Sequence, residues 1–315
     1  MRGGGARAWT LHLAVLVLLL AVQFVLPAYH HGNLARIMVL ASYAVGYNIL
    51  FGYTGLLSLG HALFFAAGMY GLGLAIKLGG WAAGPAIVAG LGAGLLLSLA
   101  VGALALRTSG VAFMIVTLMF AQAGYLAILY FGAFTRGDEG FVIPREARMI
   151  MWLDLADAAT RYFVALALFA LCLLFCLWLM RQPLGRALIA IRENEERTEM
   201  LGYDTFRLKL VAVAISGTMS AAAGAAYALL FGYVGASFAA VQYSILPLLW
   251  VLVGGAGTVL GPFLGTLFMF YLIDIASGLT TAYMMIAGVV LVMITLFARS
   301  GLLGEARRRL WGWLP

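Results

Sequence analysis

The chain has 315 residues, of which 64% are hydrophobic and only 10% are charged, and its mean hydropathy is +1.04. A soluble globular domain carries about 25% charged residues, so this composition excludes an ordinary soluble fold. The net charge of +7 does not indicate a nucleic-acid partner, because the basic residues lie at the ends of apolar runs and in loops, where membrane topology places them.

Continuous apolar runs recur along the chain. Runs of about 18 residues or more can cross the hydrocarbon core as helices, and their continuity favours helices over the alternating strands of a β-barrel. We therefore expect an all-α polytopic membrane protein, with one transmembrane domain over residues 1–315 and about ten transmembrane helices, or eight if the two weakest are re-entrant. The predicted spans are Trp9–Leu26, Leu34–Phe51, Ser58–Lys77, Ala82–Leu106, Val111–Phe131, Arg161–Met180, Leu208–Gly232, Tyr243–Val253, Val259–Ile275 and Thr281–Ala298.

The distribution of basic residues predicts the orientation. The first span follows Arg2 and Arg7, and we interpret it as a retained helix because it lacks a convincing small-residue cleavage site. With the N-terminus in the cytoplasm, thirteen basic residues fall in cytoplasmic segments and six in external ones. The positive-inside rule therefore favours an even number of spans, with both termini cytoplasmic.

Two spans run into glycine clusters, at residues 52–55 and 254–257. Glycine costs about 1 kcal/mol relative to alanine in a helix interior, and a broken helix at membrane depth must be buried in protein or line a cavity. Transporters use such breaks along their substrate paths. The candidate pathway residues are Asn48, Thr54, Ser58, His61, Gly255 and Gly257. Interfacial turns and hydrogen bonds between helices remain open as alternatives.

The longest external segment is predicted at residues 132–160. It contains Asp138 and Glu139 and a short amphipathic piece that ends at Trp152. Loops of this kind carry function but also simply connect elements, so the segment either contacts an external partner or covers the helix ends.

Small residues recur every fourth position in the span that follows residue 208. They are Ser216, Ser220, Gly224 and Ala228. Such a face allows two membrane helices to approach closely, either within one chain or between two chains. Internal packing is the interpretation we favour.

Residues 181–209 hold eleven of the 31 charged side chains of the protein and must lie in water. Pro183 suits the first turn of a helix and Gly202 suits a helix end. Leu188 and Ile191 belong to an apolar stripe at helical spacing, and the pairs Arg192–Glu196 and Glu193–Arg197 are four residues apart. This pattern predicts one amphipathic cytoplasmic helix that docks in a partner's groove or lies against its own membrane domain.

The sequence contains no catalytic constellation. None of the four histidines has a carboxylate or cysteine at metal-ligand spacing, so no metal site is predicted. A glycine-rich phosphate loop is also missing, so ATP hydrolysis would require another subunit. Only His61 and Asp274 are ionisable residues clearly inside spans, which disfavours an ion-coupled transporter.

Four segments together resemble a known family. They are Gly52–Tyr70, Val116–Gln122, Pro183–Glu195 continuing to Gly202, and Val253–Pro262. In this order they resemble the branched-chain amino acid ABC transporter permeases, in particular the LivM-like subunit. The first and third segments are specific, whereas the glycine-rich fourth segment alone would be weak.

The resemblance implies one permease subunit of a binding-protein-dependent importer in the bacterial inner membrane. Its partners would be a second homologous permease, forming a heterodimer, two cytoplasmic ATPase subunits that hydrolyse ATP, and a periplasmic substrate-binding protein. The chain itself would be no enzyme and would bind no cofactor. Residues 181–209 would contain the coupling helix, with Gly185, Arg186, Leu188, Ile191, Glu193, Glu196 and Gly202 as the coupling residues. Asp138 and Glu139 would meet the binding protein.

Two departures leave alternatives open. Arg136 stands where the family commonly has glycine, so the external loop could serve a different partner. The wider family also carries urea, short amides and aromatic acids, so cargo is not fixed by these segments. An ion-coupled transporter acting alone and a membrane scaffold are the remaining alternatives from other classes.

Overall fold

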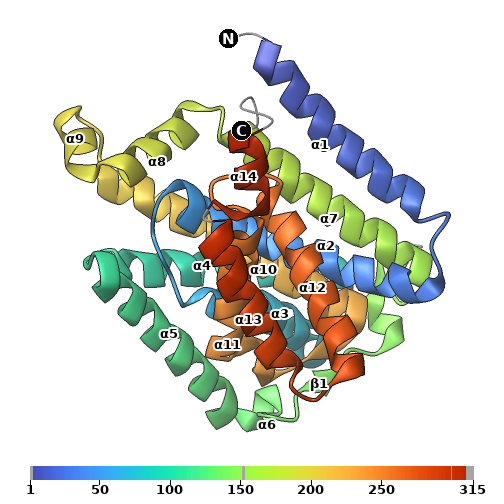
Figure 1. Cartoon of the computed structure of the whole chain (residues 1–315). Helices are drawn as coiled ribbons and strands as arrows, with labels where there is room; N and C mark the ends of the chain where they lie inside the picture. The colour runs from blue at the N-terminus through green and yellow to red at the C-terminus, as the bar shows by residue number, and fades with distance from the viewer. Residues whose placement is uncertain (1–2, 151–152, 299, 310–315) are drawn as a thin grey trace.

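The computed structural model describes residues 3–150, 153–298 and 300–309, and most of this chain is helical (Figure 1). Seven described helices are long and apolar enough to cross a membrane, and three shorter apolar helices accompany them. The polytopic all-α architecture is therefore confirmed. Arg2, Arg299 and Trp152, on which parts of the prediction depended, lie outside the described residues.

The helices follow one another through the whole chain. They are α1 (Gly3–Val22), α2 (Ala28–Asn48), α3 (His61–Gly79), α4 (Ala83–Ala105), α5 (Gly110–Tyr130), α6 (Gly132–Thr135), α7 (Ala158–Leu179), α8 (Pro183–Glu193), α9 (Glu195–Met200), α10 (Thr205–Phe231), α11 (Val241–Gly254), α12 (Gly261–Leu279), α13 (Tyr283–Phe297) and α14 (Gly301–Arg309). The shorter elements are η1 (Ile49–Tyr53), β1 (Phe141–Val142), η2 (Arg145–Arg148), β2 (Met149–Ile150), β3 (Leu153–Asp154), β4 (Tyr233–Val234) and η3 (Ala236–Ala239).

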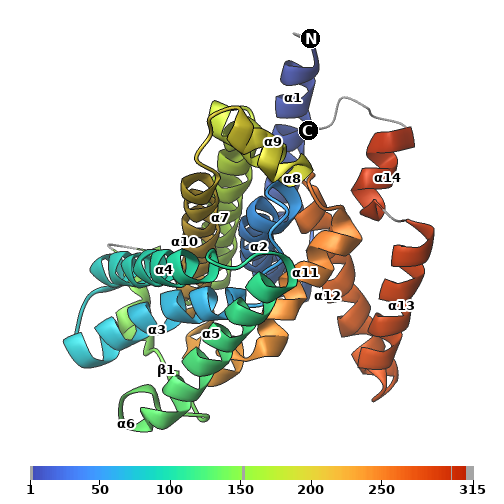
Figure 2. The same ribbon diagram turned by 90° about the vertical axis from the view of Figure 1, so that its left-hand side faces the viewer.

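The spanning helices connect two distinct ends of the molecule. Figures 1 and 2 show α8, α9, α14 and the start of α1 at one end. Both views place α6 and β1 at the other end. We call these the charged end and the loop end. The charged residues 181–209 and the segment 132–160 therefore lie on opposite sides of the helical body, and the single long helix α7 crosses the body between them.

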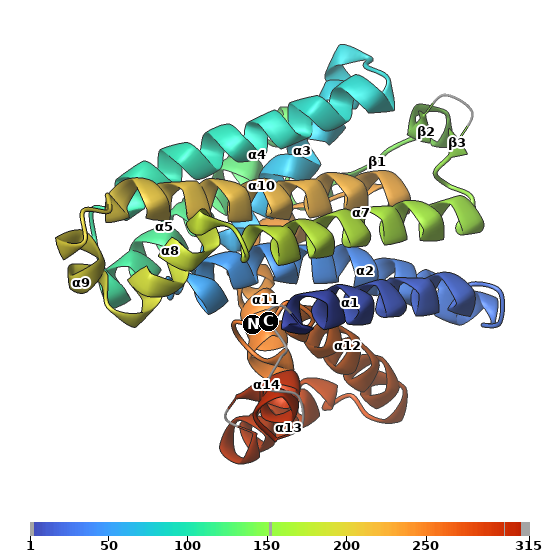
Figure 3. The same cartoon turned by 90° about the horizontal axis from the view of Figure 1, so that it is seen from above.

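Helix α2 lies at the centre of the body and α5 at its rim. In the most apolar 18-residue window, 89% of α2 is buried but only 17% of α5. Seen from above, α1, α2, α7 and α10 run alongside one another (Figure 3), and α2 contacts α7, α10 and α12. The tyrosines Tyr43 and Tyr47 of α2 are fully buried in this core.

The small residues of α10 are used for packing inside this chain. A Cβ atom at Gly224 would lie 2.0 Å from the Phe65 carbonyl oxygen, and one at Gly68 would lie 2.0 Å from that of Ala221. Real Cβ atoms cannot approach so closely, so α3 and α10 contact each other through their backbones. Internal packing, rather than a contact between two chains, accounts for the stripe that contains Gly224.

Both predicted helix breaks are present. Helix α2 ends in the single π-helical turn η1, after which residues 54–60 are not helical. Helix α11 ends at Gly254, and Gly255 and Gly257 adopt positive φ angles of 120° and 73°. Residues with a side chain rarely adopt such backbone angles, so glycine is needed at both positions. The weakest predicted span is the 14-residue α11, and α2 begins at Ala28, earlier than expected.

The predicted cytoplasmic helix is two helices rather than one. Asn194 has extended backbone angles (φ −162°, ψ 105°), ends α8 and caps α9 by accepting a hydrogen bond from the Arg197 N–H at 2.8 Å. Asparagine competes with helix continuation in this way because its side chain mimics a turn. The expected helical pairs Arg192–Glu196 and Glu193–Arg197 span this break, so their four-residue spacing has no helical meaning.

Candidate functional site

Helix α8 packs its apolar stripe onto this chain. Leu188 is fully buried and Ile191 is 5% exposed. Gly185 approaches α7 so closely that a Cβ atom there would lie 2.3 Å from the Leu179 carbonyl oxygen. The sequence left open whether the stripe docks in a partner's groove or lies against its own membrane domain. In the structure, Leu188 and Ile191 lie against the domain of this chain.

The outward surface of the charged end is different in character. The remaining predicted coupling residues are all exposed: Arg186, Glu193, Glu196 and Gly202. Beyond them the turn after α9 exposes the large apolar side chains of Met200 (85% exposed), Leu201, Tyr203 and Phe206. A partner at this end would meet a charged face beside an apolar tip. The charged residues were predictable from composition. The exposed apolar tip was not, because it depends on the bend between α8 and α9.

A buried cation fixes α9 to the start of α10. Lys209 is 8% exposed and its ammonium group pairs with the Glu195 carboxylate. The Thr205 hydroxyl donates to Glu199 Oε1 at 2.5 Å and lies 3.2 Å from Glu195 Oε1. Charge-assisted hydrogen bonds in a partly buried setting are stronger than exposed ion pairs. This network was not predicted from the sequence, although the four-residue spacing of Glu195 and Glu199 places both carboxylates on one helical face.

Arg192 joins the charged end to the first helix break. Its guanidinium donates a hydrogen bond to the Gly52 carbonyl oxygen in η1. Near Gly52, the Asn48 side chain accepts a hydrogen bond from the Gly257 N–H at 3.0 Å and donates one to the Thr258 carbonyl oxygen at 2.9 Å. Arg192 of α8 therefore contacts the first glycine break, and Asn48 joins that region to the second break by hydrogen bonds.

His61 lies at the centre of a second buried polar cluster. Its Nε2 lies 2.8 Å from Ser216 Oγ and its Nδ1 lies 3.1 Å from Ser58 Oγ. The Ser216 hydroxyl donates its own proton to the Gly46 carbonyl oxygen at 2.7 Å, so the His61 Nε2–H must be the donor to Ser216. Nδ1 then accepts from Ser58. This arrangement satisfies a neutral imidazole completely.

The six candidate pathway residues are thus brought into two neighbouring groups around the breaks. Asn48, Ser58 and His61 are at most 1% exposed, and Thr54 donates to the Ile49 carbonyl oxygen at 2.9 Å. Gly255 packs against α14, where a Cβ atom would lie 2.9 Å from the Gly304 nitrogen. All these polar groups are hydrogen-bonded inside the protein in this conformation. Within the described residues, no group of three His, Cys, Asp or Glu side chains could hold a metal ion.

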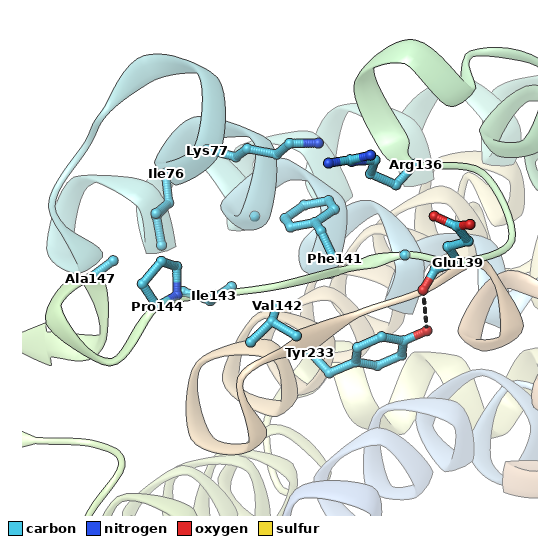
Figure 4. Close-up of a pocket in the computed structure, with 12 residues that line it drawn as sticks. Ile76, Lys77, Arg136, Glu139, Phe141, Val142, Ile143, Pro144, Ala147 and Tyr233 are labelled. Carbon is cyan, nitrogen blue, oxygen red and sulfur yellow. Dashed lines mark hydrogen bonds between the residues drawn. The ribbon is translucent and has the colours of Figure 1, made fainter.

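The loop end contains a pocket of about 760 Å³ (Figure 4). Lys77 Nζ lies 4.5 Å from the centre of the Phe141 ring and donates to the Phe134 carbonyl oxygen at 2.8 Å. Arg136 points toward Lys77, and Glu139 lies beneath it. Tyr233 closes the opposite wall by donating to the Glu139 backbone carbonyl at 3.0 Å.

Pairing between distant segments builds this pocket. Phe141 and Val142 of β1 pair antiparallel with Val234 and Tyr233 of β4, just after α10. Of the two acidic residues predicted to meet an external partner, Glu139 lines the pocket and Asp138 is exposed beside it. The role of Tyr233 in the pocket wall was not predicted, because local sequence does not indicate that two-residue strands so far apart in the chain will pair.

The chain crosses the helical body many times, and two of its apolar helices are interrupted. Polar contacts connect the interruptions with the charged end, and a pocket lies at the opposite end. This architecture is that of a transport permease. Comparison with known proteins assigns the family. The chain belongs to the family described as "Branched-chain amino acid transport system / permease component", whose model matches residues 31–298.

Individual relatives agree with this assignment. The chain is 30% identical to the high-affinity branched-chain amino acid transport system permease protein LivM of Escherichia coli K12, over 95% of this chain and 75% of that protein. A probable LivM of Methanocaldococcus jannaschii is 33% identical over 40% of this chain and 41% of the relative. The autoinducer 2 import system permease LsrC of Photorhabdus laumondii is 27% identical over 49% of this chain and 48% of its own length. No solved structure matches the chain.

Proposed function

We propose that this chain is the translocating subunit of an ATP-driven importer for branched-chain or related small amino acids. Residues 1–315 would form one permease domain in the bacterial inner membrane with both termini in the cytoplasm. Residues 181–209 would be the coupling loop and residues 132–160 the periplasmic loop. The family and the names of the LivM relatives support this assignment.

The partners follow from what the chain carries and lacks. Two ATPase subunits would hydrolyse ATP at the charged end, because the chain has no phosphate-binding loop of its own. A second homologous permease would complete the path, and the chain itself would be no enzyme and hold no cofactor. A binding protein would dock at the loop end, where Asp138 and Glu139 stand beside the pocket.

The link between Arg192 and Gly52 is the observation that carries the proposal. It connects a solvent-exposed helix directly to a break in a buried membrane helix. A push on α8 would therefore reach Gly52, and through Asn48 the backbone at Gly257. Movement of both breaks would release the His61 cluster from its closed arrangement and open the path that the pathway candidates border.

We predict that Arg192→Ala uncouples ATP hydrolysis from uptake. A hydrogen bond to a charged group contributes about 1.5–3 kcal/mol, so ATP-dependent leucine uptake in vesicles containing the whole complex should fall about tenfold or more. Arg192→Lys should restore part of it. The matched control is Arg107→Ala, an exposed arginine in the turn after α4.

ATPase activity distinguishes coupling from assembly. Hydrolysis by the Arg192→Ala complex should continue while uptake fails. Normal uptake in this variant would contradict the proposed route. Uptake driven by an ion gradient without ATP would instead support the lone secondary transporter. Competition by urea, amides, aromatic acids or autoinducer 2 in the same assay would reassign the cargo, for which the likeness to LsrC gives a reason.

A further inference from the structure

Helix α5 presents one complete face to the outside of this chain. The exposed residues follow one another at spacings of three or four: Val111, Ile115, Met119, Gln122, Leu126 and Tyr130. The opposite face is buried and holds Phe113, Thr117 and Ala121. Figures 1 and 2 show α5 at the rim of the molecule. We call the exposed row the α5 stripe.

Gln122 makes this stripe unsuited to lipid. It lies two residues from the midpoint of α5 and its side chain is exposed. Within the described part of the chain its carboxamide has no hydrogen-bond partner. An amide without a partner is strongly disfavoured in hydrocarbon, and polar side chains inside spans usually face a cavity or a neighbouring helix.

Another exposed helix shows the contrast. Leu96 of α4 is also two residues from the midpoint of its helix and is 70% exposed. Its exposed neighbours Leu95 and Leu99 are apolar as well. That face suits lipid tails, whereas a carboxamide near the middle of α5 needs water or a polar partner.

Helix α5 also lies directly against the first helix break. The Leu59 N–H donates to Thr117 Oγ1 at 3.2 Å. A Cβ atom at Gly60 would lie 2.6 Å from the Thr117 carbonyl oxygen. The buried face of α5 therefore contacts the segment between η1 and His61. A displacement of that segment would change its contacts with α5.

We propose that the α5 stripe faces the second permease subunit across a water-filled part of the transport path, with Gln122 offering its amide to polar groups of the cargo. This inference rests on the proposed function, because it requires a second permease. It assigns α5 rather than the buried cluster as the wall of the path in the conformation described. The buried Asn48 and His61 would then control the breaks from behind that wall.

Cysteine accessibility tests the placement. In the assembled complex, with Cys172 and Cys176 replaced by alanine, Gln122→Cys should react with a membrane-impermeant methanethiosulfonate reagent at least tenfold faster than the control Leu96→Cys, which is also an exposed position near the middle of an apolar helix. A benzophenone amino acid replacing Met119 should crosslink to the second permease, and one replacing Leu96 should not.

The outcomes separate the inference from the function on which it rests. Equal, slow reaction of Gln122→Cys and Leu96→Cys in a complex that still imports cargo would overturn the α5 assignment and leave the proposed function intact. Crosslinking of position 119 to lipid alone would also overturn it. A purified complex that contains no second permease would overturn both. A final readout is uptake: Gln122→Leu should lower it several-fold with ATP hydrolysis retained, and Gln122→Asn should restore part of it.

Discussion

Single glycines set the distance between α3 and α10. At Gly68 the space for a side chain is occupied by the backbone of Ala221, which cannot rotate away as a flexible side chain could. Gly92 on α4 is also a mid-helix glycine, but nothing lies within 4 Å of its missing Cβ atom. The two positions therefore separate the effect of close packing from the effect of glycine itself.

We predict that Gly68→Ala destabilises the protein by about 1–3 kcal/mol, because overpacking forces the two helices apart. Gly92→Ala should instead stabilise the protein by about 0.5–1 kcal/mol, because alanine is the better helix former and its methyl group meets no neighbour there. Reversible unfolding in detergent micelles, followed by tryptophan fluorescence, measures both. Equal effects of the two substitutions would mean that the helices adjust freely and that the contact is loose.

The segment 132–160 contains a pH-dependent contact. Arg145 donates to Asp154 at 2.6 Å, and this hydrogen bond lowers the pKa of the Asp154 carboxyl group below its ordinary value. The contact therefore stabilises the fold above the unfolded pKa of about 4, and the contribution is lost as the pH falls through the lowered pKa.

We predict that the loop loosens in acid. A spin label on exposed Val142 should become more mobile between pH 6 and pH 3. In Asp154→Asn the mobility should be independent of pH over the same range, because the titrating group is gone. A label that responds equally in both proteins would assign the change to another group.

At the scale of elements, the bend between α8 and α9 decides which side chains a partner meets. Glu193 and Glu196 stand on either side of Asn194 and both are exposed. Their carboxylates share the outward face with the exposed Arg186 and Arg197, whereas Leu188 and Ile191 are buried beneath it. The buried stripe of α8 is therefore not offered to a partner, and we expect the charged face to contribute to recognition beside the apolar tip.

We predict that Glu193→Lys combined with Glu196→Lys leaves the protein inserted in the membrane but reduces co-purification of the ATPase several-fold, since reversed charges at an interface repel the partner. Glu146→Lys, an exposed reversal at the loop end, is the control. If the double variant retains its ATPase and transports normally, the charged end is not the coupling surface.

The same elements show what local sequence can predict. The start of α8 at Pro183 and the breaks at Gly52 and Gly254 were predictable, because proline and glycine change the backbone conformations available at their own positions. The bend at Asn194 was not, because asparagine is tolerated in helices and its capping role depends on the turn that it creates. The apolar stripe of α8 was found, but a periodic pattern does not say what covers it.

At the scale of the whole molecule, composition and the apolar runs predicted the many-pass helical class, since lipid allows few alternatives to any chain. The orientation that the charge bias predicts stays a prediction. The polar clusters were recognised only as costly residues in apolar surroundings. Their pairing joins Asn48 with Gly257 and His61 with Ser216, across more than 150 residues. Such contacts depend on helix packing, which single-sequence patterns do not encode.

The carboxamide of Asn48 has a mechanical consequence. It holds the backbone at Gly257 and Thr258 with two hydrogen bonds of opposite polarity, and Gly52 lies so near that a Cβ atom there would be 2.5 Å from the Gly257 nitrogen. The two interruptions are therefore not independent hinges. We expect the two breaks to move together, because displacing one without the other would break the hydrogen bonds that join them. Two interruptions that are separate in the sequence would then act as one moving part of the permease.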